Sequence, residues 1–369
     1  MFYIFLALVA LSAALVICLN AEAIGRRLGV MDHPDNQRKT HDQPTPLVGG
    51  IGILLPLLIW ISGVLFSGIA ENTQPLVVLM LCAAGVGLVG FADDQTPISP
   101  LTRVLALLVF LAVAIEVSPG LIAPSLNWGS FEPTYLPPSL YCALIALTTV
   151  GIVNAVNMAD GQNGLVPSMF VIWSLCLVLV GDAVVSPVAQ ILAVASFVVL
   201  IFNLRGKLFL GDCGSYGVTF VLGILALMTY AQGRITIETV TVWFYIPVAD
   251  CLRLIITRRL QGRSPLAPDK DHFHHRLQVK LGPRYGLVAY IASVAGSAFI
   301  AALAPRFALV CLIALTAIYF SFAWLTDPVS DLAVGSRDEA DTGRGSLDES
   351  FTNVVSLAAS EQVQLRERA

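Results

Sequence analysis

Long apolar stretches recur along the chain, and short polar segments separate them. Eleven stretches are long enough to cross the ~30 Å hydrocarbon layer of a bilayer as helices of about 20 residues. Because backbone groups inside lipid must be satisfied within the segment, helices are the expected form. The predicted spans are residues 2–20, 47–67, 74–92, 101–117, 138–156, 165–181, 185–203, 214–230, 239–257, 285–303 and 306–325. The pattern therefore predicts an all-α polytopic membrane protein.

Basic residues are distributed unevenly between the two sides of these spans. No Lys or Arg precedes the first span, whereas Arg26 and Arg27 follow it, which is typical of a retained helix rather than a secretory signal peptide. When the loops are then counted alternately, only Arg234 and Arg306 of the 21 Lys and Arg residues fall on the outer side. Because cytoplasmic loops carry such an excess of positive charge, we expect the N-terminus outside and the C-terminus in the cytoplasm.

Composition agrees with a membrane protein and excludes other classes. Of the 369 residues 56% are hydrophobic and only 12% are charged, and the mean hydropathy is +0.79. Soluble domains carry about 25% charged residues. The net charge of −4 gives no basic surface for nucleic acid, and none of the seven cysteines has a partner at C-x-x-C spacing, so neither a disulfide framework nor a zinc site is expected.

The last 44 residues differ in character from the rest of the chain. Residues 326–369 hold nine acidic residues against four arginines and few apolar residues. Such a composition favours disorder. We therefore expect a transmembrane domain over residues 1–325 and a cytoplasmic, disordered acidic tail over residues 326–369.

The first inside loop combines basic side chains with a glycine-rich helix start. Arg38, Lys39 and His41 precede Gly49-Gly50. Charge together with the backbone N–H groups of a helix N-terminus is suited to holding a phosphate. The alternative is an ordinary positively charged turn on the inner side.

Two further inside loops carry acids and amides at the ends of predicted helices. The adjacent carboxylates of Asp93 and Asp94 are costly at a membrane face unless a cation neutralises them, and Mg²⁺ prefers carboxylates together with substrate phosphates. Asn154 and Asn157 lie three residues apart and share one helix face, with Asp160 at the helix end. These groups suit a polar ligand or a metal. The alternatives are a solvated turn for the acid pair and a helix cap for Asp160.

The fourth and fifth inside loops complete the set. Asp212 stands among glycines where a helix is expected to begin, so it is suited to binding a metal while the helix N-terminus faces phosphate oxygens; the alternative is a simple helix cap. The preceding Lys207 adds a positive charge. The fifth loop places three histidines among Lys and Arg. This setting favours binding of an anion or a sugar over binding of a transition metal. The alternative is a loop without a binding role. These histidines are His272, His274 and His275.

Taken together and in this order, the five motifs resemble the polyprenyl-phosphate N-acetylhexosamine-1-phosphate transferase family, of the glycosyltransferase 4 type. The similarity runs from about residue 25 to 280 and is closer to the branch that initiates O-antigen and teichoic acid synthesis than to the peptidoglycan branch. The matching motifs are Arg38-Lys39-x-His41 with Gly49-Gly50; Asp93-Asp94; Asn154-x-x-Asn157-x-x-Asp160-Gly161; Phe209-x-Gly211-Asp212-x-Gly214-Ser215; and Asp269-x-x-His272-x-His274-His275.

The resemblance implies an activity, partners and a place in the cell. The expected reaction transfers a sugar-1-phosphate, first of all N-acetylglucosamine-1-phosphate, from a UDP-sugar to undecaprenyl phosphate and releases UMP. It would initiate O-antigen or another cell-envelope glycan at the cytoplasmic face of a bacterial inner membrane. The expected cofactor is Mg²⁺, with Mn²⁺ as the alternative. The resemblance leaves open which UDP-sugar is used and whether the chain forms a homodimer.

Residue roles follow from the motif matches. Asp212 is the expected metal ligand, and Asp93, Asp94 and Asp160 are the expected catalytic acids, with Asp93 orienting or deprotonating the lipid phosphate. Three positions depart from the family pattern, because acids are usual where this chain has Pro97 and Asn163, and a glutamine where it has Leu107. The residues expected to bind the substrates are Arg38, Lys39, His41, Asn154, Asn157, Lys207, His272, His274 and His275.

Two alternatives remain at this level. The transfer could proceed in one displacement or through an aspartyl-phosphate intermediate. The main alternative from another class is a secondary transporter, which would bind its substrate near the bilayer midplane on intramembrane charges. Only Glu116 and Asp250 are acids within predicted spans, and both lie near span ends, which disfavours a transporter.

Overall fold

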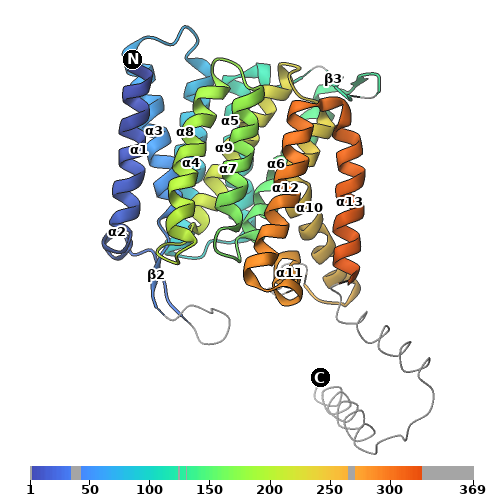
Figure 1. The fold of residues 1–369 in the computed structure, drawn as a ribbon. Coiled ribbons are helices and arrows are strands. Elements are labelled where there is room, and N and C mark those ends of the chain that lie inside the picture. The colour runs from blue at the N-terminus through green and yellow to red at the C-terminus, as the bar shows by residue number, and fades with distance from the viewer. Residues whose placement is uncertain (1, 35–42, 124, 130, 265–270, 326–369) are drawn as a thin grey trace, which may run out of the picture. The chain divides into compact units, whose positions relative to one another are not determined.

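The structure is a computed structural model that describes residues 2–34, 43–123, 125–129, 131–264 and 271–325 (Figure 1). Residues Met1–Ser321 form one compact unit. Ten helices of the described chain are long and apolar enough to cross a membrane, and no closed sheet accompanies them. They are α1 (Phe2–Leu19), α3 (Gly49–Ser67), α4 (Gln74–Gln95), α5 (Pro100–Val117), α6 (Pro138–Ala159), α8 (Val185–Asn203), α9 (Gly211–Ala231), α10 (Ile237–Leu260), α12 (Pro283–Leu303) and α13 (Ala308–Leu325). The predicted all-α polytopic membrane fold is confirmed.

The eleventh predicted span forms a shorter helix than expected. Residues 165–181 were predicted to span, and the structure places α7 at Leu165–Val180, which has 16 residues. At 1.5 Å per residue such a helix measures about 24 Å, less than the hydrocarbon layer. Phe170 and Trp173 are buried, and the indole N–H of Trp173 donates to the carbonyl oxygen of Trp243 at 2.7 Å. Protein therefore covers most of α7, which is consistent with its short length.

Several short elements that the hydrophobic pattern did not predict lie between the long helices. They are α2 (Ala21–Leu28), β1 (Met31–Asp32) paired with β2 (Thr45–Pro46), η1 (Pro119–Leu121), β3 (Ser125–Leu126) paired with β4 (Thr134–Tyr135), α11 (Phe273–Leu281) and η2 (Pro305–Phe307). In Figure 1, α2, β2 and α11 lie at one end of the helix bundle, called the site end below, whereas β3 lies at the opposite end. The predicted tail, residues 326–369, lies outside the described residues.

Glycines allow α3, α4 and α9 to pack with their backbones almost in contact. A Cβ atom added to Gly50 of α3 would lie 2.1 Å from the backbone nitrogen of Gly214 in α9. One added to Gly90 of α4 would lie 2.3 Å from the backbone oxygen of Asp212. Small residues permit this close approach of membrane helices. The packing fixes the N-terminus of α9, which carries Asp212, against the C-terminal end of α4.

Candidate active site

Asp93 and Asp94 lie in the last turns of α4 rather than in the loop where the sequence placed them. The carboxylate of Asp94 accepts hydrogen bonds from the backbone N–H groups of Asp212 at 2.7 Å and Cys213 at 2.9 Å. These N–H groups belong to the first turn of α9 and have no partner within that helix. Asp94 therefore acts as a cap supplied by another helix, and it holds the backbone that carries Asp212.

Asp212 directs its side chain toward α6. The side-chain amide of Asn157 donates to the Asp212 carboxylate at 2.6 Å and also contacts the Ser215 hydroxyl at 2.9 Å. Asn154 does not join this group, because its amide donates to the carbonyl oxygen of Val150 in its own helix at 2.8 Å. Of the two amides predicted to share a face, the structure thus brings only Asn157 to Asp212.

Asp93 is buried and almost fully occupied by donors. Arg103 of α5 forms an ion pair with its carboxylate, with nitrogen–oxygen distances of 2.7 and 3.1 Å. The backbone N–H of Ile98 donates to the same carboxylate at 2.9 Å, and the Tyr216 hydroxyl donates at 3.2 Å. Arg103 also donates to the Tyr216 hydroxyl at 3.0 Å. Three residues therefore hold the Asp93 carboxylate in place, and one of them, Arg103, balances its charge.

Asp160 ends α6 and lies beside the histidine-bearing segment. Desolvation by the surrounding protein, and then the nearby charge of Asp212, raise the pKa of Asp160 to about 7. A Cβ atom added to the next residue, Gly161, would lie 2.8 Å from Nε2 of His274. The absence of a side chain at Gly161 is what lets the histidine approach this turn. The structure therefore brings the Asp160 turn and the predicted histidine loop together.

The three histidines form a group at the start of α11, which was predicted as a loop. His272 is the residue before the helix, and the rings of His272 and His274 are stacked with centroids 5.4 Å apart. The rings of His274 and His275 are 4.2 Å apart. Burial, followed by the neighbouring histidines, lowers the pKa of His274 to about 3, so its imidazole is neutral at physiological pH. Its Nε2 is buried and has no hydrogen-bond partner among the described residues.

A buried amide ties the third and fourth loops together. The side-chain oxygen of Asn203 accepts from the backbone N–H of Gly164 at 2.5 Å, and its amide donates to the carbonyl oxygen of Leu208 at 3.0 Å. The predicted substrate-binding residue Lys207 is exposed on this fourth loop. The remaining predicted binding residues, Arg38, Lys39 and His41, lie outside the described residues.

The donor set at the site end suits one kind of metal better than others. Within the described ranges no three His, Cys, Asp or Glu side chains are arranged to hold a metal ion. Zinc-type sites require such a preformed set, whereas Mg²⁺ is held by one or two carboxylates with water and substrate phosphates. Asp212 and Asp160 repel each other, and a divalent cation relieves that repulsion. The residues present fit Mg²⁺ completed by a substrate.

Sequence reasoning missed the partners that hold these groups. Arg103 and Tyr216 lie on α5 and α9, inside stretches that read simply as apolar spans. A charge next to a predicted acid pair was the available signal for Arg103. From the sequence, Asp250 stands out only as an acid near a span end. In the structure its carboxylate oxygen Oδ2 lies 3.1 Å from Nδ1 of His272. The cost of burying an acid in a membrane helix was the signal that Asp250 has a dedicated partner.

Comparison with known proteins finds a family, and several relatives that match most of the chain. The sequence profile described as glycosyl transferase family 4 matches residues 76–230. The chain is 31% identical over 271 residues to the undecaprenyl-phosphate alpha-N-acetylglucosaminyl 1-phosphate transferase of Escherichia coli strain K12, covering 69% of this chain and 71% of the relative. It is 28% identical over 283 residues to the probable undecaprenyl-phosphate N-acetylglucosaminyl 1-phosphate transferase of Bacillus subtilis, covering 73% and 75%.

A third relative has a different lipid in its name. It is the decaprenyl-phosphate N-acetylglucosaminephosphotransferase of Mycobacterium tuberculosis strain H37Rv, 28% identical over 308 residues, covering 74% of this chain and 75% of the relative. The matched regions include the acid-bearing helices α4, α6 and α9 of the site end. The chain therefore belongs to glycosyl transferase family 4 and, as its loop motifs indicated, is a membrane enzyme of the polyprenyl-phosphate N-acetylhexosamine-1-phosphate transferase kind.

Proposed function

We propose that the chain transfers N-acetylglucosamine-1-phosphate from UDP-N-acetylglucosamine to undecaprenyl phosphate, with release of UMP. The observation that carries the proposal is the convergence of Asp212, Asp160 and the three histidines at one end of an otherwise apolar helix bundle. A polyprenyl tail stays in lipid at about 0.8 kcal/mol per buried CH₂, whereas a nucleotide sugar stays in water. A polar site at the end of membrane helices is where the two substrates can meet.

The reaction is an exchange of phosphoryl partners. An oxygen of the lipid phosphate attacks the β-phosphorus of the nucleotide sugar, the bond from that phosphorus to the bridging oxygen breaks, and UMP leaves with the bridging oxygen. Phosphoryl transfer of this kind depends mainly on positioning and on neutralising charge. The second pKa of a phosphate monoester is near ~6, so the lipid phosphate is mostly dianionic at neutral pH and needs little help from a base.

The described residues divide the work between them. Asp212, oriented by Asn157, and Asp160 would hold Mg²⁺ or Mn²⁺, which when bound neutralises charge on the diphosphate. Asp94 positions the backbone of Asp212. We assign Asp93 the role of positioning Arg103, because the Asp93 carboxylate already accepts from several donors. The Arg103 side chain is 28% exposed, so it is the member of this pair that a substrate can reach. The histidine group, together with Lys207, would bind the diphosphate and the sugar.

The cellular setting follows from charge and lipid. The strong bias of Lys and Arg toward one set of loops supports a cytoplasmic site end in a bacterial inner membrane. Undecaprenyl-linked N-acetylglucosamine is a starting unit for cell-envelope glycans, so we propose a role in initiating O-antigen or a related polymer. UDP-N-acetylglucosamine is the preferred donor because the sugar appears in the names of all three relatives.

The direct test uses the full chain in lipid nanodiscs with Mg²⁺ and undecaprenyl phosphate. A panel of UDP-sugars is supplied, UMP release is measured and the lipid product is weighed by mass spectrometry. UDP-N-acetylglucosamine should give a lipid-diphosphate-sugar at the highest rate. Absence of UMP release with every donor contradicts the proposal, and a faster product from another UDP-sugar corrects the donor.

A second measurement separates the two routes of transfer. Labelled UMP is incubated with the enzyme and UDP-N-acetylglucosamine in the absence of any lipid acceptor. We propose a single displacement, because Asp93 is held by its donors and Asp94 is bound to the backbone of α9. Label should then stay out of the nucleotide sugar, whereas its exchange would establish an aspartyl-phosphate intermediate.

A further inference from the structure

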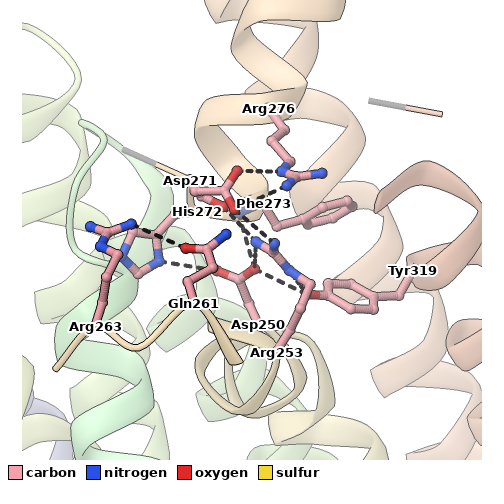
Figure 2. Close-up of polar contacts among 9 residues, drawn as sticks. All are labelled: Asp250, Arg253, Gln261, Arg263, Asp271, His272, Phe273, Arg276 and Tyr319. Carbon is pink, nitrogen blue, oxygen red and sulfur yellow. Dashed lines mark hydrogen bonds and ion pairs between the residues drawn. The ribbon is translucent and has the colours of Figure 1, made fainter. Parts of the chain in front are cut away.

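A buried acid on α10 lies behind the histidine group. The residue is Asp250, which is 5% exposed and lies within a helix that is otherwise largely apolar. One of its carboxylate oxygens, Oδ1, accepts from Arg253 at 2.9 Å, from the Tyr319 hydroxyl at 3.0 Å and from the backbone N–H of Phe273 at 3.1 Å. The other, Oδ2, lies 3.1 Å from Nδ1 of His272. Figure 2 shows how these groups surround the carboxylate.

Arginines neutralise the charge of this region without any ligand. Arg253 donates to Tyr319 at 3.0 Å and to the Asp271 carboxylate at 3.2 Å. Asp271 in turn accepts from Arg276 at 2.7 and 3.0 Å. The network joins α10, α11 and α13, as Figure 2 shows. Asp250 and its neighbours are therefore complete as a structural unit and do not themselves require a metal or a substrate.

The hydrogen bonds of Asp250 determine which nitrogen of His272 carries a proton. An ionised carboxylate only accepts hydrogen bonds. Because Oδ2 lies at hydrogen-bond distance from Nδ1, that nitrogen must be the donor, and Nε2 on the other side of the ring is the nitrogen left for a ligand. The His272 side chain is 11% exposed, so it is nearly fixed in this orientation.

We infer that Asp250 and Tyr319 are positioning residues for the proposed transfer: they hold His272 with its Nδ1 protonated and its Nε2 presented to the diphosphate or sugar of the donor substrate. The inference rests on the proposed function for the identity of that substrate. The His272 ring is stacked at 20° on the His274 ring, which contacts the turn after Asp160. A rotation of His272 would therefore also disturb the packing of His274 against Gly161.

Tyr319 adds to the site a residue from a part of the chain that holds none of the five motifs. It lies on α13, beyond residue 280 where the motif resemblance ends, and is 1% exposed. Its ring also packs on Phe273, with centroids 4.8 Å apart. Helix α13 thus supports the segment that follows His272 through both a ring contact and a hydroxyl group.

Asp250→Asn tests the protonation directly because it keeps the shape of the side chain. The single amide oxygen can still accept from Arg253, Tyr319 and Phe273, and the NH₂ group then faces Nδ1 of His272. That arrangement requires Nδ1 to accept, so the proton moves to Nε2. Nitrogen NMR of the full chain labelled on histidine, with the His272 signals identified by their loss in His272→Gln, reports which nitrogen is protonated.

In the wild type, Nδ1 of His272 should be the protonated nitrogen, because it lies 3.1 Å from a carboxylate oxygen of Asp250 that can only accept. In Asp250→Asn the assignment should reverse, and kcat/KM for UDP-N-acetylglucosamine should fall about 10–100-fold, mainly through KM, as when the partner of a metal-bound histidine is removed. Tyr319→Phe should keep Nδ1 protonated and lower kcat/KM about threefold to tenfold, because the hydroxyl loses its hydrogen bonds with Asp250 and Arg253.

Tyr290→Phe is the matched control. Tyr290 on α12 is equally buried and packs on the same Phe273 ring at 5.8 Å, but no hydrogen bond of its hydroxyl is found in the described chain. It should leave the protonation and kcat/KM unchanged. A bare Nδ1 in the wild type overturns the inference even if Asp250→Asn fails to fold, and so does an unchanged KM in a folded Asp250→Asn. A wild type with the expected protonation but no turnover refutes the proposed function instead.

Discussion

Two acidic clusters lie at the site end, and their charges are balanced in different ways. In the first, formed by Asp250 and Asp271, each acid has an arginine partner at 3.2 Å or less. In the second, the carboxylates of Asp160 and Asp212 make no ion pair among the described residues. Because an unpaired, partly buried charge is costly, the second cluster is where the ligand is expected to supply positive charge.

This difference distinguishes a cluster that supports the site from a cluster that takes part in the reaction. The cluster around Asp250 is satisfied within the protein and holds a histidine in place. Around Asp212, only the two acids of α4 have charged or backbone partners within the protein. Asp94 accepts from the backbone of α9, and Asp93 pairs with Arg103. The two inner carboxylates are left for a cation and a diphosphate. Substitutions in the second cluster should therefore affect turnover most strongly.

The largest expected effect belongs to Asp212→Asn. The change keeps the side-chain shape but removes the charge that would bind Mg²⁺, so UMP release should fall about 10³-fold, as when a major electrostatic contact to a reacting group is lost. The thermal unfolding temperature should change little. Addition of EDTA to the wild type should give a similar loss that excess Mg²⁺ reverses.

Asp182→Asn is the control for that change. Asp182 lies at the far end of the bundle, where its carboxylate accepts from the backbone N–H groups of Val184 at 2.9 Å and Val185 at 2.7 Å. Asparagine caps helices about as well as aspartate, so turnover should match the wild type. Full turnover by Asp212→Asn would remove the distinction between the two clusters.

The next largest effect is expected from Gly90→Ala, which acts on Asp212 through packing. The new methyl group would lie 2.3 Å from the backbone oxygen of Asp212 and would force α4 and α9 apart. Overpacking of this kind costs about 1–3 kcal/mol, and the bonds from Asp94 to the first turn of α9 would lengthen. Both the unfolding temperature and UMP release should fall, the latter by about 10²-fold.

Gly223→Ala, in the partner helix α9, serves as the comparison. No atom lies within 4 Å of a Cβ added at Gly223 of α9. Alanine also has the higher helix propensity, so stability should be equal or slightly higher and turnover unchanged. Normal activity in Gly90→Ala would show that the close approach of α4 and α9 does not position Asp212.

The sequence predicted the elements of the fold well and the contacts of the site only in part. Apolar stretches of about 20 residues identify membrane helices because lipid imposes both their length and their composition. The hydropathy pattern did not predict α2 or α11, because these helices lie between spans and have no such long apolar run. The same limit placed Asp93 and Asp94 in a loop, since a hydropathy pattern ends where charge begins even though α4 continues to Gln95.

Within the site, local spacing predicted faces but not partners. The three-residue spacing of Asn154 and Asn157 is consistent with a shared helix face, yet only Asn157 reaches Asp212. The pairing of Asp93 with Arg103 and of Asp250 with Tyr319 depends on how separate helices pack. Such packing depends on many side chains at once, so no single motif reports it.

A smaller effect is expected from Arg103→Lys. A guanidinium binds a carboxylate through two nitrogens, whereas an ammonium is a point charge that cannot contact Asp93 and Tyr216 in the same way. The positive charge remains, so kcat/KM for undecaprenyl phosphate should fall about tenfold and not more. Arg234→Lys, at the other end of the bundle, should leave it unchanged, and equal losses in both variants would mean that Arg103 has no special place in the site.

The smallest effect is expected from Asp271→Asn, in the cluster that is complete without a ligand. The side chain of Asp271 is 35% exposed, and an asparagine oxygen can still accept from Arg253 or Arg276. Water reaches the Asp271 side of these ion pairs and screens them in part. UMP release should therefore stay within about twofold of the wild type, and the protonation of His272 should not change. A loss as large as that of Asp212→Asn would mean that the histidine-bearing cluster takes part in the chemistry rather than supporting it.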